Sequence, residues 1–316
     1  MGNSSSQLRV GVVGVGHLGR EHARIYSNLQ ACQLTAICDT DRERLSECHK
    51  RTKGPKFDDY RALIGQVDAV SIAVPTQHHY EIAKFFLENG IHVLVEKPIT
   101  YTLEQADELL QIAKAKQIAL RVGHVERFNA AFSAVQQMAT QIRFLEIHRL
   151  GPFTARGTDC GVVLDLMIHD LDVILKLIQK PVESCEAIGV SVLTPYEDIA
   201  NARIKFEGGA ICNVTASRLT LKRQRKIRIF QEDAYISLDY GNQEAEIFRK
   251  KGNEITREKM NIKKEEPLRN ELEHFVSGVI NGTNTNQPDI DARNALALAI
   301  DIQNQIRSVP YHAPSV

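Results

Sequence analysis

A lysine at the end of an apolar segment carries the strongest chemical signal in this chain of 316 residues. The run Ile91-His92-Val93-Leu94-Val95-Glu96-Lys97-Pro98 predicts a strand buried inside a parallel sheet, where near-continuous apolar sequence is typical. Open α/β sheets bind their ligands just beyond the carboxyl ends of the strands. Because an unpaired buried ammonium is costly, we expect Lys97 to meet water, an anion or a ligand there. Lys97 therefore indicates chemistry rather than stability.

A second chemical pair lies in the apolar segment 163–178, whose periodicity predicts a helix. Asp165 and His169 are four residues apart and share one face of that helix. Imidazole titrates near neutrality, so this histidine suits proton transfer. Taken alone, the pair is more typical of an ordinary core histidine beside an aspartate that caps the helix or pairs with it. Beside Lys97 and a dinucleotide motif, proton transfer is the stronger interpretation.

The dinucleotide motif is Gly14-Val15-Gly16-His17-Leu18-Gly19, which follows a predicted strand at 8–13 and opens a predicted helix at about 18–29. In that context the glycines permit a tight turn, close approach of a pyrophosphate and close packing of the helix. The N–H groups at the helix N-terminus are available to phosphate. We therefore predict that this turn binds a dinucleotide.

The acid that follows the second predicted strand selects between the two nicotinamide cofactors. Asp39 lies twenty residues after Gly19, where a carboxylate suits the ribose hydroxyls of NAD and repels a 2′-phosphate. Arg42 and Arg44 are close to it in the sequence and keep NADP open as the less favoured alternative. We expect NAD.

A further loop follows another predicted buried strand, at 69–74, and ends at the same edge of the sheet. Pro75, Thr76 and His79 are therefore expected to line the nicotinamide side of the site. Adjacent His78 and His79 on an extended segment face opposite ways, and neither a cysteine nor a carboxylate cluster accompanies them. We expect no metal there.

Two domains are predicted to position these residues. The first, residues 8–124, alternates strands with helices and should form a doubly wound parallel sheet, a Rossmann domain. The second, residues 125–316, should be an α+β domain with a large, mostly antiparallel sheet, because consecutive strand candidates follow one another without helices. These candidates are 184–193, 200–206, 210–217, 226–231, 234–238 and 244–249. Residues 1–7 form a predicted disordered tail.

Composition limits the functional classes. Hydrophobic content is 43%, charged content 25% and formal net charge zero, so no global field favours nucleic acid or anionic membranes. No apolar run approaches the roughly 20 residues of a membrane span. The six cysteines are scattered, which is typical of reduced thiols in a cytoplasmic protein. The Gly2 start fits a myristoylation pattern, although a polar tail explains it equally simply.

The glycine motif, Glu96-Lys97-Pro98 and Asp165-x-x-x-His169 together resemble the Gfo/Idh/MocA oxidoreductases over essentially the whole chain. Within that family, residues 123–129 and 165–170 are most similar to the UDP-N-acetylglucosamine 3-dehydrogenases. The resemblance implies NAD-dependent oxidation of a ring hydroxyl. The product would be a 3-keto nucleotide sugar, made ahead of transamination for amide-linked lipid A.

The resemblance also implies roles for the residues. His169 would be the general base, and Asp165 would orient its ring or share the substrate hydroxyls. Lys97 would stabilise the developing alkoxide, with Lys97 as the base the mechanistic alternative. Glu96 would meet the cofactor ribose.

The diphosphate of such a substrate needs cations. Arg127 and Arg156 are the candidates, and the basic stretch 218–228 is a second option whose alternative is a solvated hairpin at a sheet edge. Two other functions stay open: an inositol or free-sugar dehydrogenase, and a regulator that binds NAD without turnover. We expect a homodimer or homotetramer assembled through the second sheet.

Overall fold

The computed structural model describes residues 7–154, 160–283 and 289–308. The predicted acylation site at Gly2 and the candidate cation Arg156 lie outside these ranges. The chain divides into two compact units, Met1–His124 with Leu268–Arg293, and Val125–Pro267 with Asn294–Val316. None of the helices in the described ranges has the length and apolar character that crossing a bilayer requires.

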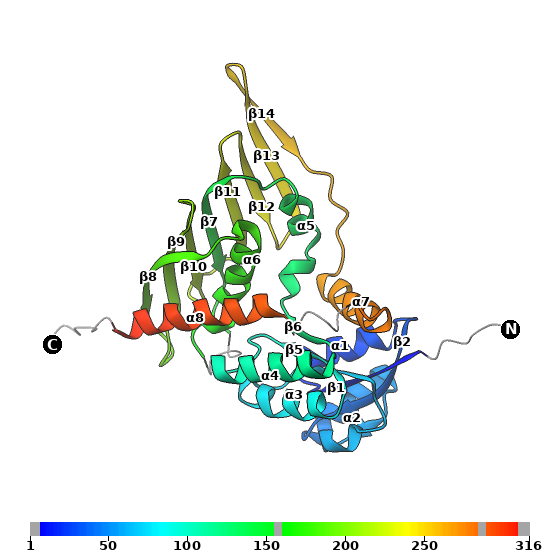
Figure 1. Ribbon diagram of the computed structural model, residues 1–316. Coiled ribbons are helices and arrows are strands. Elements are labelled where there is room, and N and C mark those ends of the chain that lie inside the picture. Colours follow the sequence, from blue (N-terminus) through cyan, green and yellow to red (C-terminus); the bar gives the residue numbers. More distant parts are fainter. Residues whose placement is uncertain (1–6, 155–159, 284–288, 309–316) are drawn as a thin grey trace. The chain divides into compact units, whose positions relative to one another are not determined.

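The first unit is built on a six-stranded parallel sheet in the order β3-β2-β1-β4-β5-β6 (Figure 1). The order reverses between β1 and β4, which makes their carboxyl ends the switch point where such sheets bind ligands. All four residues of β4 are buried, as the apolar sequence predicts. The strands are β1 (Leu8–Val13), β2 (Cys32–Cys38), β3 (Lys56–Phe57), β4 (Ala69–Ile72), β5 (His92–Glu96) and β6 (Leu120–Gly123).

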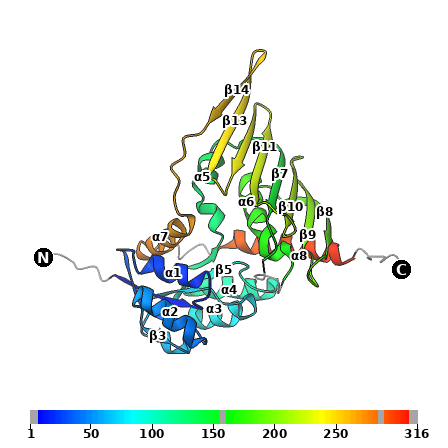
Figure 2. The same ribbon diagram turned by 180° about the vertical axis from the view of Figure 1, so that it is seen from behind.

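Helices cover both faces of this sheet. On one side α1 (Gly19–Tyr26) packs with α2 (Arg42–Thr52), and on the other α3 (His79–Glu88) packs with α4 (Leu103–Lys116) (Figure 2). Asp41 begins α2 by accepting the backbone N–H groups of its first turn, and so satisfies donors that lack an intrahelical partner. Two short 3₁₀ turns complete the unit, at Tyr60–Leu63 and Thr76–His78.

Helix α7 (Pro267–Ile280) corrects the predicted domain division, which assigned every residue after 124 to the second domain. Its side chains Leu272, Phe275 and Val276 are buried in the same core cluster as Val10 and Tyr26. The apolar face of α7 thus completes the core of the first unit. Apolar periodicity can indicate a helix but does not reveal which core that helix joins.

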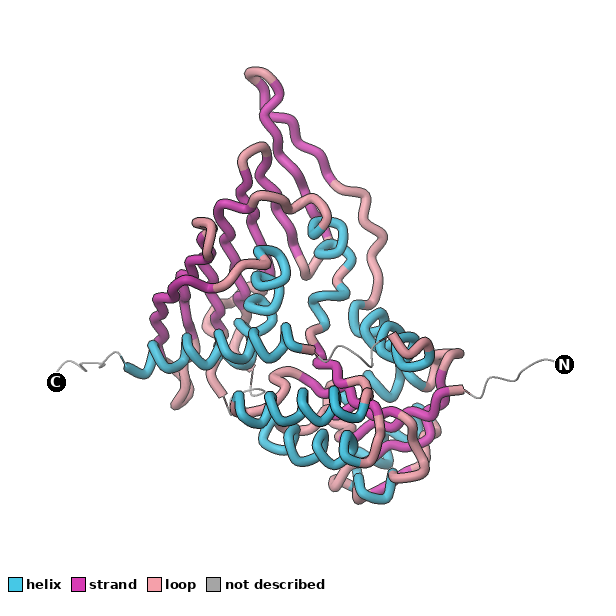
Figure 3. The backbone as a smooth tube through the Cα atoms, viewed as in Figure 1, coloured by secondary structure: helices cyan, strands magenta, loops and turns pink. Residues whose placement is uncertain are grey.

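The second unit contains an eight-stranded sheet in the order β14-β13-β12-β11-β7-β10-β9-β8 (Figure 3). Only the β7–β10 pair is parallel among its strand pairs within the described residues. The strands are β7 (Ile142–Leu150), β8 (Val182–Val190), β9 (Ile199–Phe206), β10 (Ile211–Ser217), β11 (Gln224–Gln231), β12 (Ala234–Asp239), β13 (Glu244–Lys251) and β14 (Glu254–Lys259). The sequence missed β14 because all its residues are exposed and show no apolar alternation.

One face of this sheet is covered by α5 (Ala130–Gln136), α6 (Ile168–Ile178) and α8 (Ile290–Ser308) (Figures 1 and 2). A short 3₁₀ turn at Val125–Phe128 precedes α5. The predicted helix 163–178 is confirmed only in part, because Val163–Met167 forms a π-helical turn before α6. Apolar periodicity does not distinguish this wider turn from an α-helical one.

Candidate functional site

The glycine turn after β1 has the shape that a dinucleotide requires. Gly14 adopts a φ of 83°, and a Cβ on Gly19 would lie 1.8 Å from the carbonyl oxygen of Gly14. These two glycines therefore serve the tight turn and the close packing of α1. A Cβ on Gly16 would meet no atom within 4 Å, so space remains at the turn where a pyrophosphate can approach. The turn fits NAD.

Asp39 is tied to this turn. One carboxylate oxygen accepts the N–H of Val15 at 2.8 Å and the other accepts the N–H of Asp41 at 2.9 Å. The half-buried carboxylate is thus held beside the glycine turn, as a ribose-binding acid would be. Arg44 pairs with Asp41 at 3.1 Å, which partly neutralises the cation that could favour NADP.

A cavity of about 740 Å³ opens beside the turn and Asp39. Pro75 of the predicted cofactor loop lines it, together with Val74 and His78, whereas Thr76 and His79 do not. The other lining residues are Val13, Gly14, Gly16, Cys38, Asp39, Thr40, Arg44, Asp58, Asp59, Tyr60, Arg61, Ala73, Glu81 and Ile82.

His79 has a different place from the one that the sequence predicted. It is 1% exposed, so its ring is withdrawn from the cavity surface. Its Nδ1 lies 2.8 Å from the carbonyl oxygen of Pro98, and its Nε2 lies 2.9 Å from that of Val74. The ring therefore spans the two loops that follow β4 and β5. Spacing alone did not reveal this, because the acceptor in Pro98 is 19 residues away.

Lys97 is half-buried, while the residues on both sides of it, from Val93 to Glu96 and from Pro98 to Thr100, are buried. The Glu96 carboxylate accepts the N–H of Lys97 at 3.3 Å and lies 3.1 Å from Nε2 of His22. Glu96 is itself 7% exposed. The predicted contact of Glu96 with the cofactor ribose thus stays a prediction.

His22 is a site residue that the sequence reasoning missed. It lies one turn after Gly19 on α1 and is fully buried. The available signal was a histidine on the inward face of the helix that follows the glycine turn. Gly123 leaves room for its partner, since a Cβ there would lie 2.7 Å from the Glu96 carboxylate.

In the second unit, Asp165 and His169 are half-buried, and Leu164, Met167 and Ile168 beside them are buried. The two polar side chains stand on the π-helical turn and on the first turn of α6. The structure thus places them on the less buried side of an otherwise apolar helix.

Arg127 is already engaged inside the second unit. Its Nε donates to the Asp172 carboxylate at 2.7 Å, and a second nitrogen contacts the other carboxylate oxygen. The guanidinium is thereby held in a bidentate ion pair. Its predicted contact with a diphosphate stays a prediction.

The basic stretch 218–228 is heterogeneous. Arg218 is buried and donates to the carbonyl oxygen of Cys160 at 2.7 Å, whereas Lys222 and Arg223 beside the fully exposed Leu221 are exposed. Arg225 is exposed as well, so three cations of this stretch can meet a ligand. The stretch connects β10 to β11, and both strands pair with β7 rather than with each other, so the predicted alternative of a hairpin at a sheet edge is wrong.

A buried charge network of Arg149, Asp170 and Glu126 includes one residue of α6, Asp170. Arg149 donates to the Asp170 carboxylate at 2.7 and 2.9 Å and to Glu126 at 3.0 Å. All three side chains are nearly fully buried. The network joins β7, α6 and the 3₁₀ turn that carries Arg127. The sequence reasoning missed it, although Arg149 takes the inward position after Leu145 and Ile147 in an alternating strand.

A second network begins the helix that carries Asp165. Val162 donates its N–H to the carbonyl oxygen of Glu197 at 2.9 Å, and Val163 donates to the Glu197 carboxylate. Gly161 is required there, because a Cβ would lie 1.9 Å from that carboxylate. A carboxylate at a helix N-terminus is favourable. The helix start is thus set by a residue more than thirty positions away.

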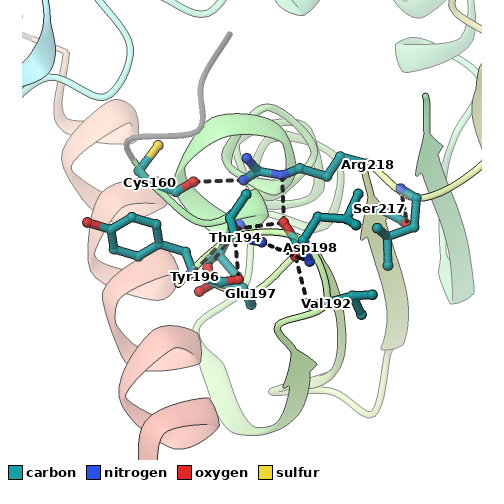
Figure 4. A network of polar contacts seen from close by, with 11 residues as sticks. Cys160, Val192, Thr194, Tyr196, Glu197, Asp198, Ser217 and Arg218 are labelled. Atoms are coloured by element: carbon teal, nitrogen blue, oxygen red, sulfur yellow. Dashed lines mark hydrogen bonds and ion pairs between the residues drawn. The ribbon is translucent and has the colours of Figure 1, made fainter. Parts of the chain in front are cut away.

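Asp198 fixes the segment that provides this carboxylate (Figure 4). It accepts the N–H groups of Val192, Leu193 and Thr194 at 2.5 to 2.9 Å, and Arg218 lies 3.6 Å away. Burial alone would raise the pKa of Asp198, but the three backbone N–H groups lower it to about 2.

Two family models match the chain. Residues 8–124 match an oxidoreductase family with an NAD-binding Rossmann fold, the Gfo/Idh/MocA family. Residues 112–237 match the Gfo/Idh/MocA C-terminal domain.

Curated and solved proteins resemble the chain along its length. UDP-N-acetylglucosamine 3-dehydrogenase from Acidithiobacillus ferrooxidans is 34% identical over 94% of this chain and 96% of its own. Its solved structure has a TM-score of 0.90 and covers 96% of this chain and 98% of that one. The scyllo-inositol 2-dehydrogenase (NAD(+)) of Bacillus subtilis is 27% identical over 96% and 95% of the two chains. A levoglucosan dehydrogenase in complex with NADH and levoglucosan, 18% identical, shares the fold with a TM-score of 0.84, covering 96% and 98%.

Proposed function

This chain belongs to the Gfo/Idh/MocA family of oxidoreductases, and on that premise we propose that it uses NAD to oxidise a ring hydroxyl of a nucleotide sugar. The substrate we propose is UDP-N-acetylglucosamine, oxidised at C3, because the relative of that name matches nearly the full length of both chains. The product would be a 3-keto sugar for transamination ahead of amide-linked lipid A.

The observation that carries the chemistry is the exposure of three polar residues. Lys97, Asp165 and His169 are each half-buried among neighbours that are almost all buried. Polar groups that reach the edge of an apolar environment can act on a ligand there with little screening by water. A purely structural ion pair needs no such access.

The residues can divide the reaction as follows. The Gly14–Gly19 turn and Asp39 would hold NAD, which would supply the acceptor for the hydride that leaves the substrate carbon. His169 accepts the hydroxyl proton, and Asp165 orients the imidazole or the neighbouring hydroxyls. Lys97 donates a hydrogen bond to the reacting oxygen and stabilises its developing negative charge.

We further propose that the Gly14–Gly19 turn, Asp39 and Pro75 contact the cofactor, with Thr76 and Glu96 close to it. For the substrate diphosphate we propose the exposed Lys222 and Arg223 ahead of Arg127, because the guanidinium of Arg127 already pairs with Asp172.

The outward face of the second sheet supports an assembly of two or four copies. Partly exposed rings form a continuous ladder on it, with centroids 4.9 to 5.6 Å apart, from Phe144 through Phe230 and Tyr235 to Phe248. A contiguous aromatic patch on a sheet face is typical of a protein contact. The six cysteines are free, which supports a cytoplasmic location.

The test is NADH formation with UDP-N-acetylglucosamine, other UDP-sugars, inositols and free sugars. We expect turnover of UDP-N-acetylglucosamine, and losses of about 10²–10⁴-fold in kcat for His169→Asn and Lys97→Met with NADH binding retained. Activity restricted to inositol or a free sugar would refute the substrate. NADH binding without turnover of any sugar would indicate a regulator.

The pH dependence of the two variants separates the candidate bases. If His169 is the base, Lys97→Met keeps the acidic limb of the kcat profile at a lowered plateau, and His169→Asn abolishes that limb. The reverse result would make Lys97 the base.

A further inference from the structure

We propose that His79 is a positioning residue, which donates Nδ1–H to the carbonyl oxygen of Pro98 and thereby fixes the turn that aims the Lys97 ammonium. The inference rests on the proposed function of Lys97 and adds the residue that determines its placement. His79 itself is withdrawn from ligand, being 1% exposed.

The contacts on both sides of Lys97 carry the proposal. On the N-terminal side, the buried Glu96 carboxylate accepts the backbone N–H of Lys97 at 3.3 Å. On the C-terminal side, the His79 ring lies 2.8 Å from the Pro98 carbonyl oxygen. Only the Lys97 side chain reaches the surface of this segment, because residues 93–96 and 98–100 are buried. The direction of the ammonium therefore depends on how the backbone is held.

The second nitrogen of His79 connects the turn to the cofactor cavity. Nε2 lies 2.9 Å from the carbonyl oxygen of Val74, and Val74 and Pro75 line that cavity. The buried His79 ring thus connects the cavity wall, which follows β4, to the Lys97 turn, which follows the neighbouring strand β5. Its position sets the spacing between the cofactor loop and the proposed polarising cation.

The protonation of the ring decides which of the two carbonyls receives a hydrogen bond. Burial lowers the pKa of the His79 imidazole, while the two carbonyl oxygens and Glu96 oppose that shift and Lys97 adds to it. A neutral imidazole donates through one nitrogen only. Because the proposal assigns that N–H to Nδ1, it distinguishes between two amide substitutions.

The variants follow from this assignment. In His79→Asn the side-chain amide can occupy the position of Nδ1 and still donate to Pro98, whereas in His79→Gln it reaches the position of Nε2 and Val74. His79→Phe keeps a ring of similar size and removes both nitrogens. The matched control is His92→Phe at the start of β5, the strand that precedes Lys97, where Nδ1 accepts the N–H of Ala119 at 3.0 Å, remote from the turn.

We expect His79→Phe and His79→Gln to lower kcat for UDP-N-acetylglucosamine by about 10²-fold, the order of loss that a displacement of about 1 Å produces. The KM values should change little, since no ligand contact is removed. His79→Asn should recover most of the lost kcat, and His92→Phe should keep the kcat of the parent. Equal kcat values for the Asn and Gln variants would overturn the assignment of the donor.

Hydrogen–deuterium exchange of the peptide spanning residues 95–102 provides a readout that is independent of activity. It should exchange faster in His79→Phe and His79→Gln than in the parent, and unchanged in His79→Asn and His92→Phe. Unchanged exchange in His79→Phe would refute the positioning role. If the parent oxidises no sugar, the proposed function fails, and the exchange data still decide whether His79 holds the turn.

Discussion

At the scale of single residues, the buried charge of Arg149 is matched to specific partners. Arg149 lies at a strand position that faces the core, where two carboxylates receive its three hydrogen bonds. Burying any of these charges alone would cost several kcal/mol, so the set is stable only when it is complete. Its third member, Asp170, directly follows the proposed base His169, and the network therefore also constrains the first turn of α6.

Arg149→Met tests this network. The substitution leaves the Asp170 and Glu126 carboxylates buried without their cation, so we expect a loss of about 3–5 kcal/mol in the free energy of unfolding. Urea denaturation followed by circular dichroism measures it. The control is Arg269→Met, which breaks an exposed ion pair with Glu273 and should cost at most about 1 kcal/mol. Similar losses for the two variants would contradict the view that the buried network is special.

At the scale of elements, the helix that carries Asp165 and His169 depends on a distant segment for its start. Glu197 satisfies the N–H groups of Val162 and Val163, and Asp198 holds the backbone of that segment in place. Such tertiary capping replaces the local Ser, Thr or Asp that begins other helices, such as Asp41 in α2. The π-helical turn lies directly after this cap.

Asp198→Asn tests the support of the cap through its pH dependence. The pKa of about 2 in the folded protein is below the usual value of about 3.9 for an aspartate. The ionised carboxyl therefore stabilises the fold above about pH 4, and this contribution is lost as the pH falls through about 2. We expect the variant to be less stable by about 2–3 kcal/mol at pH 7 and by less at about pH 3.5.

Urea midpoints of the parent and of Asp198→Asn at the two pH values measure the difference. Asp233→Asn is the control, because that carboxylate is largely exposed and its loss should matter little at either pH. A stability difference that is the same at both pH values would argue against a contribution from the ionised carboxyl.

At the scale of the whole molecule, the unit that binds the cofactor is assembled from two separate parts of the sequence. Residues up to His124 supply the parallel sheet, and Leu268–Arg293 contributes α7 and the residues after it. Arg293 pairs with Asp107 at 2.8 Å, and the Asp289 carboxylate accepts the N–H of Val122 at 3.3 Å. The C-terminal segment thus stabilises the Rossmann unit through polar contacts as well as through its core.

Phe275→Ala tests this dependence. Phe275 is 1% exposed in the core of the first unit, so we expect its truncation to cost about 3–5 kcal/mol. NADH at about one hundred times its dissociation constant should restore about 2.7 kcal/mol, because it binds the folded unit. Scanning calorimetry with and without NADH measures both effects. The half-exposed Ile280 on the same helix supplies the control variant, Ile280→Ala. If Phe275→Ala leaves the NADH-sensitive transition unchanged, α7 does not support that unit.

Much of this protein was determined by local sequence. The bounds of β1 match the predicted strand at 8–13, since the apolar run of a buried strand is a local property of the sequence. The glycine turn could be predicted from the sequence because its conformation requires residues that lack a Cβ atom. The charged and polar residues Lys97, Asp165 and His169 stood out because each interrupts an apolar segment.

Only the tertiary structure decided which distant groups meet. The tertiary structure placed α7 in the core of the first unit. It brought Glu197 to the start of the helix that carries Asp165 and His169. It also directed the His79 ring to the Pro98 carbonyl rather than into the cavity. The physical reason is common to all three. A buried polar group or an apolar helix face must find a partner, but local periodicity reports only that it is inward. The partner is chosen when segments far apart in the chain pack together.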